Sequence, residues 1–175
     1  VRVAGVRTAD NGQMNSTTQR SSNSGDISLI TNAKDARIAG VATQDGATQI
    51  HADNSGNVSF EYTGEKVSGY YAYASLGVAY RSGSTATVSG TYSGALTLKG
   101  IENTVCYYGL LGGWVKEGTG MNVNAVKIKK GTVINGVSVS SVDTDQGYYK
   151  NRDFLFSNLN PSDAVLTMDS LTLID

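Results

Sequence analysis

The fold class is decided by residues 85–99, which read TATVSGTYSGALTLK. The larger apolar residues of this stretch occupy alternate positions: Ala86, Val88, Tyr92, Leu96 and Leu98. Side chains of a β-strand alternate between two faces, so this spacing is typical of a strand with one buried face. It is the longest such stretch in the chain, and it favours β-structure over helix.

Shorter stretches of the same kind extend this interpretation along the chain. They include residues 27–29, 36–41, 49–52, 58–62, 76–80, 123–128 and 133–142. Turn-forming clusters of Gly, Asn, Asp and Ser separate them. The pattern predicts an all-β fold of about nine to twelve short strands, arranged as a single-domain antiparallel sandwich or jelly roll. A β-solenoid is the alternative, because Gly25–Gly40 and Gly56–Gly69 share a loose rhythm of glycine, alternation and charge.

The N-terminal region has a different composition from the rest of the chain. Val1, Val3 and Val6 form a short strand-like run, and mostly small polar residues follow up to residue 26. We therefore expect residues 1–26 to be a strand-like arm on a polar tether, and residues 27–175 to be the sandwich domain. The chain begins with Val, not Met, which predicts a processed N-terminus of the kind that export produces.

The composition disfavours several classes of function. The chain has one His, one Cys, one Pro and a formal net charge of −1 in 175 residues. Few residues are therefore available for acid–base, nucleophilic or cofactor chemistry, and we expect neither an enzyme nor a cofactor. A nearly neutral chain has no electrostatic reason to bind nucleic acid. The sequence also contains no apolar run of 18 or more residues, so no membrane span is predicted.

Two acidic turns are candidate calcium sites, although a polar turn is the favoured interpretation of both. Asp143 and Asp145 precede a glycine with the alternate spacing that calcium loops use, and the segment from Asp53 to Asn57 is a weaker version. The first turn lacks the distal bidentate glutamate, and the second has Glu61 eight residues after Asp53. No metal site is predicted at either turn. Asn15 and Asn57 lie in glycosylation sequons, a weak signal in a chain so rich in Asn, Ser and Thr.

The single cysteine and the tyrosines are the remaining candidates. Cys106 lies in an apolar context and has no second cysteine to pair with, so we expect a buried small side chain. A Cys106–His51 catalytic pair has nothing in the sequence to support it. The ten tyrosines are interpreted mainly as core and edge residues, but an outward row of them would bind sugar or a protein partner.

These observations favour an extracellular structural subunit over an enzyme. The composition is rich in Gly, Ser, Thr and Asn, and it is similar to that of exported filament and tail proteins. We expect a pilus-like surface filament or a virion tail structure, a homopolymer in which Val1, Val3 and Val6 add a strand to a neighbouring subunit. The alternative is a carbohydrate- or receptor-binding module of a larger surface or phage protein, with a glycan as ligand.

Overall fold

The computed structural model describes residues 1–8, 21–45, 49–82, 86–111, 113–115, 119–142, 164–168 and 170–175. Within these residues the chain forms 17 β-strands and one short 3₁₀-helix, η1 (Ile101–Asn103), without any α-helix. The predicted all-β class is confirmed.

The strands form three sheets, which we call A, B and C. Sheet A contains β1 (Arg2–Thr8), β4 (Asp35–Asp45), β7 (Tyr71–Ser75), β8 (Val78–Ser82), β11 (Val105–Gly109) and β12 (Gly113–Val115). Sheet B contains β2 (Ser21–Asn23), β5 (Gln49–Asn54), β9 (Ala86–Tyr92), β13 (Thr119–Lys129), β16 (Ala164–Met168) and β17 (Leu171–Ile174). Sheet C contains β3 (Ile27–Thr31), β6 (Val58–Tyr62), β10 (Ala95–Lys99), β14 (Val133–Ile134) and β15 (Val137–Ser138).

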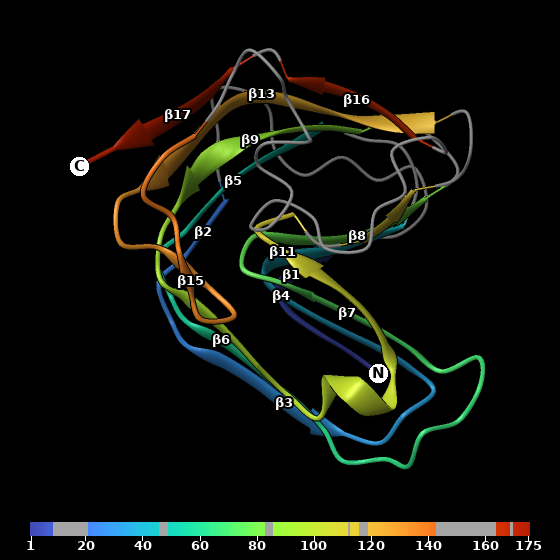
Figure 1. Ribbon diagram of the computed structural model, residues 1–175. Helices are drawn as coiled ribbons and strands as arrows, with labels where there is room; N and C mark the ends of the chain where they lie inside the picture. Colours follow the sequence, from blue (N-terminus) through green and yellow to red (C-terminus); the bar gives the residue numbers. More distant parts are fainter. Residues whose placement is uncertain are drawn as a thin grey trace.

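The chain visits sheets A, B and C in the same order four times, which makes the molecule a β-solenoid. Through these four coils the strands of each sheet pair with the equivalent strands of the next coil, and this pairing is parallel. β16 and β17 follow the fourth coil and pair with β13, also in the parallel sense. The one antiparallel pair in the described part of the chain is the terminal hairpin of β14 and β15. In Figure 1 the strands of each sheet therefore overlap, as in a view along the stack.

The predicted antiparallel sandwich is wrong, because the sheets are built from parallel strands that come from successive coils. The alternation of apolar residues reports which face of a strand is buried, but not the direction of the neighbouring strand. The described part of the stretch that decides the fold class, residues 86–99, also forms two strands and not one. β9 lies in sheet B and β10 in sheet C, and Gly94, with φ of 101°, turns the chain between them.

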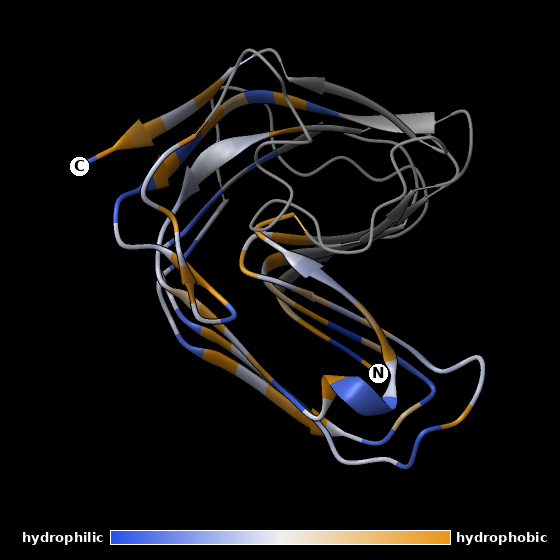
Figure 2. Cartoon of the chain, in the orientation of Figure 1, coloured by the Kyte–Doolittle hydropathy of each residue, from blue (hydrophilic) through white to orange (hydrophobic). Residues whose placement is uncertain are grey.

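The core lies inside the coils and is built from columns of equivalent residues. Ile27, Val58, Leu96 and Ile134 occupy one column of sheet C, one residue for each coil. Val58, Leu96 and Ile134 are buried, whereas Ile27, in the first coil, is only partly covered. Figure 2 shows apolar and polar residues mixed along the strands, as expected when one face packs inward and the other faces outward.

The turn from sheet B to sheet C repeats almost unchanged between the first two coils, where the sequence reads Asn-Ser-Gly at residues 23–25 and 54–56. The Asn23 Nδ2 donates a hydrogen bond of 2.8 Å to the Asn54 Oδ1, and the Asn54 Nδ2 donates one of 2.8 Å to the Gly56 carbonyl oxygen. A Cβ atom on Gly56 would overlap the carbonyl oxygen of Gly25. Close approach of the two backbones therefore requires glycine at residue 56.

The geometry of this turn predicts different effects on stability for two glycines that are equivalent in sequence. Gly56→Ala should lower the free energy of unfolding by at least about 2 kcal/mol, because the new methyl group overlaps the backbone of the preceding coil. Gly25→Ala, whose nearest neighbour to a Cβ atom is the Asn23 Oδ1 at 3.8 Å, should be nearly neutral. Urea denaturation followed by circular dichroism measures both. Equal stability of the two variants would contradict the stacking of these turns.

Candidate binding surface on sheet A

The best-defined polar and aromatic cluster in the described residues lies on the outer face of sheet A. The parallel register places Arg2, Arg37, Tyr73 and Tyr107 side by side on β1, β4, β7 and β11. A second column beside it contains Asp35, Tyr71 and Val105. Residues from four coils are therefore brought together, although they lie far apart in the sequence.

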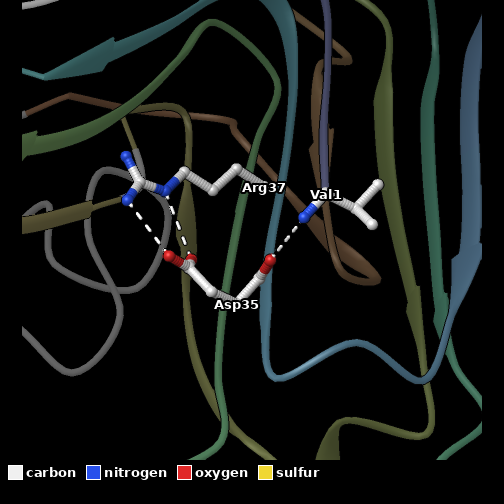
Figure 3. A network of polar contacts seen from close by, with 3 residues as sticks. All are labelled: Val1, Asp35 and Arg37. Atoms are coloured by element: carbon white, nitrogen blue, oxygen red, sulfur yellow. Dashed lines mark hydrogen bonds and ion pairs between the residues drawn. The ribbon is translucent and has the colours of Figure 1, made fainter.

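The Arg37 side chain organises this face. It is 1% exposed, and its guanidinium donates to both carboxylate oxygens of Asp35, from Nε to Oδ1 at 3.3 Å and from the terminal nitrogen to Oδ2 at 3.4 Å. The two residues also flank Val1 in the backbone ladder. The Val1 nitrogen donates to the Asp35 carbonyl oxygen at 2.7 Å (Figure 3). The Arg37 amide donates to the Val1 carbonyl oxygen at 2.8 Å. A buried guanidinium needs such partners, since an uncompensated buried charge is strongly destabilising.

The aromatic part of the column continues from this guanidinium. The Arg37 Cζ lies 5.3 Å from the ring centroid of Tyr73, within the range of a cation–π contact. The Tyr73 and Tyr107 rings are stacked, with centroids 5.5 Å apart and planes 12° from parallel. Burial, and to a smaller extent the neighbouring Tyr71, raises the pKa of the Tyr107 hydroxyl. Tyr107 is therefore held in place and stays neutral well beyond physiological pH.

The neighbouring column is open to solvent. Tyr71 is 42% exposed and Val105 is 45% exposed, while Asp35 is partly exposed. We call Asp35, Tyr71, Val105 and Tyr107 the tyrosine surface. It corresponds to the outward row of tyrosines that we considered, from the sequence, as a binding site for a sugar or a protein partner. Of the two residues that support it, Tyr73 was among the tyrosines interpreted as core and edge residues, and Arg37 was not predicted.

The two residues considered for nucleophilic catalysis lie in different sheets. The Cys106 side chain packs inside the coils on β11 of sheet A, whereas His51 is on β5 of sheet B. The His51 Nδ1 forms a hydrogen bond with the Ser89 Oγ of the adjacent strand. The burial predicted for Cys106 is confirmed, and this burial raises the pKa of its thiol to about 12.

The second calcium candidate is a structural turn. The Asp53 Oδ1 accepts the Thr91 amide at 2.6 Å, and Asn54 belongs to the ladder between coils. No cluster of three or more His, Cys, Asp or Glu residues suited to a metal occurs among the described residues. Asp143 and Asp145 lie outside the described residues, so that prediction is not tested.

Of the two sequons, Asn57 is described and Asn15 is outside the described residues. Both ends of the Asn57 amide are in use. Its Nδ2 donates to the Asp26 Oδ1 at 3.1 Å, and its Oδ1 accepts the Ala95 amide at 3.0 Å. A glycan on this nitrogen would interfere with the contact to Asp26.

The expected arm is a strand of sheet A. Val1, Val3 and Val6 belong to the segment that pairs with β4 in the parallel sense, Val3 opposite Ile38 and Val6 opposite Ala42. β1 occupies the outer edge of the sheet, since β4 is its sole strand partner among the described residues. A contact of these valines with a second subunit stays a prediction.

Comparison with protein-family models, curated proteins and solved structures finds no match for this chain. Among the described residues, no helix is long and apolar enough to cross a membrane.

The burial of Cys106 predicts a thiol that is unreactive in the folded protein. At pH 8 the folded protein should resist iodoacetamide, because a thiol with a pKa of about 12 has very little thiolate at that pH. The same protein in 8 M urea should be alkylated fully, as followed by mass spectrometry. Because burial raises the pKa of the folded-state thiol above its ordinary value of 9.0, the free energy of unfolding should fall as the pH rises from 9 toward 12. Rapid alkylation of the folded protein would contradict the burial of Cys106.

Proposed function

We propose that this protein is an extracellular structural subunit that assembles with copies of itself, by strand pairing at the N-terminal end of the solenoid. The observation that supports this proposal is the edge that β1, β2 and β3 form together at that end, with no described strand beyond it. Each of these strands pairs with the following coil on one side and with no described strand on the other. Unpaired strand edges are templates for pairing with another chain.

The backbone of β3 defines the edge most clearly. The Ile27 amide donates to the Asn57 carbonyl oxygen at 2.9 Å, and the Thr31 carbonyl oxygen accepts the Thr63 amide at 2.9 Å. Backbone groups of successive residues in a parallel strand point to opposite sides. Those of Ser28 and Ile30 therefore point away from β6, toward the open end of the stack.

The side chains of β3 do not protect this edge. The strand reads ISLIT, without a charged residue or proline of the kind that natural edges use to prevent pairing. Ile30 is 65% exposed, which is the largest exposed fraction among the described large apolar residues. A second copy that covers this end would also cover Val1, which is 58% exposed, and the partly buried Val3 and Ile27.

The expected strand donation takes a modified form at this end of the molecule, because the donated strand does not leave its own sheet. β1, with Val1, Val3 and Val6, is the outermost strand of sheet A, so it presents its free edge to a neighbour while it stays paired with β4. If this end contacts the opposite end of the next copy, the contact is heterologous and repeats, which builds a filament. A pilus-like filament or a virion tail is such a structure. A role without catalysis agrees with the scarcity of His and Cys in the chain.

If copies of the protein assemble through this edge, charged residues placed on β3 should abolish assembly. The double variant Ser28→Lys, Ile30→Lys should remain monomeric in sedimentation velocity runs and form no filaments in negative-stain electron microscopy, because lysines on an edge strand oppose pairing. Both side chains are exposed, so the melting temperature should change little.

A matched control is available in the same column of sheet C, two strands away from β3. Thr97 is exposed on β10, and it lies in register with Ser59 of β6 and therefore with Ser28. Because β10 is paired on both sides, Thr97→Lys should assemble like the unmodified protein. A monomeric unmodified protein at high concentration, or equal assembly of the double variant, would rule out the proposal.

A further inference from the structure

The tyrosine surface has the chemistry of a ligand site, and this site is independent of the edge that supports assembly. It lies on the outer face of sheet A, whereas the edge is the end of the stack. Tyr71 offers an exposed ring and Tyr107 a ring that is stacked on one side by Tyr73. The hydroxyl groups of Tyr71 and Tyr107 make no hydrogen bond within the described structure. Two amphipathic rings at diagonal positions of the adjacent strands β7 and β11 therefore have their polar tips available.

The polar partner of these rings is held in advance of any binding. The Asp35 carboxylate is oriented by the two hydrogen bonds from Arg37, and the Arg37 side chain is itself fixed by burial and by the Tyr73 ring. A fixed carboxylate next to an aromatic ring accepts hydroxyl groups without losing side-chain freedom on binding. Hydroxyl groups are the hydrogen-bonding groups that sugars carry in the largest number.

The size of the surface distinguishes a small ligand from a protein. A standard protein interface takes about 20–30 residues from each side. The exposed large apolar residues in this part of the described structure are Val1, Val67, Tyr71 and Val105. The tyrosine surface itself spans β4, β7 and β11, about 10 Å at the usual strand spacing. A short segment of an oligosaccharide fits it better than a folded partner.

The charge of the surface selects the class of sugar. The Arg37 guanidinium is buried and paired with Asp35, so it does not present positive charge to a ligand. The charged group that faces solvent in the tyrosine surface is the carboxylate of Asp35. Because this carboxylate is paired with the Arg37 guanidinium, the pair carries no net charge and gives a sulfated or uronic acid sugar no cationic partner.

We propose that the tyrosine surface binds a neutral oligosaccharide, with the rings of Tyr71 and Tyr107 stacked against sugar faces and Asp35 accepting hydroxyl hydrogen bonds.

The test is isothermal titration calorimetry of the full chain with four neutral probes: cellohexaose, maltohexaose, mannohexaose and chitohexaose. We expect at least one probe to bind with a dissociation constant near 1 mM or below, as is reasonable for a shallow surface. Tyr71→Ala should weaken that binding about tenfold, because it removes the most exposed ring. Asp35→Asn should weaken it as well. Tyr71→Phe should keep part of it, because the ring remains.

Ile30→Ala is the matched control, because Ile30 is an exposed apolar residue on sheet C, away from the tyrosine surface. It should bind the probe like the unmodified protein. The proposal is overturned if none of the four probes binds at millimolar concentration, or if Tyr71→Ala binds as well as the unmodified protein. If Tyr71→Ala changes sedimentation and not sugar binding, the surface is a protein interface. Repeating the titration with the Ser28→Lys, Ile30→Lys variant separates sugar binding from assembly.

Discussion

The close stacking of successive coils at the turn between sheets B and C is the constraint on which the rest of the structure depends. The Asn23 side chain of the first coil donates a hydrogen bond to the Asn54 side chain of the second coil. The backbone of Gly56 lies so close to that of Gly25 that no side chain fits between them. A Cβ atom on Gly94, the glycine of the next coil, would likewise overlap the carbonyl oxygen of Gly56. This column of glycines fixes the register of the coils. Since a one-residue shift would turn every strand inside out, fixing the register fixes the core.

The same stacking produces both candidate functional regions. Equivalent residues of successive coils form columns, so one column on the outer face of sheet A brings together Arg37, Tyr73 and Tyr107. Inside the coils, the equivalent columns are apolar and bury Cys106. Because every coil uses the next one as its partner, the first coil has no described partner on one side. The unpaired edge at the N-terminal end and the tyrosine surface on sheet A therefore both follow from the stacking of repeated coils.

The sequence predicted the strands far better than their arrangement. Residues 58–62 were expected to form a strand and do so as β6, because alternation reports local burial directly. The direction of pairing was missed, since it depends on the repeat and not on any single strand. The repeat is visible in Gly25, Gly56 and Gly94, but their spacing is uneven. The site was predicted only as tyrosines of unknown placement. Arg37 and Tyr73 become neighbours through the register, which the sequence alone does not disclose.

The most direct test of this account is a spin-label measurement of the register. Ser28, Ser59 and Thr97 are exposed and lie in one column of sheet C, and the buried Cys106 should remain unlabelled. Labels at Ser59→Cys and Thr97→Cys should broaden each other's electron paramagnetic resonance lines strongly, because the strands are about 5 Å apart. Labels at Ser28→Cys and Thr97→Cys, separated by about 10 Å, should interact less strongly. Spectra of both pairs equal to the sum of the single-label spectra would contradict the stacked coils.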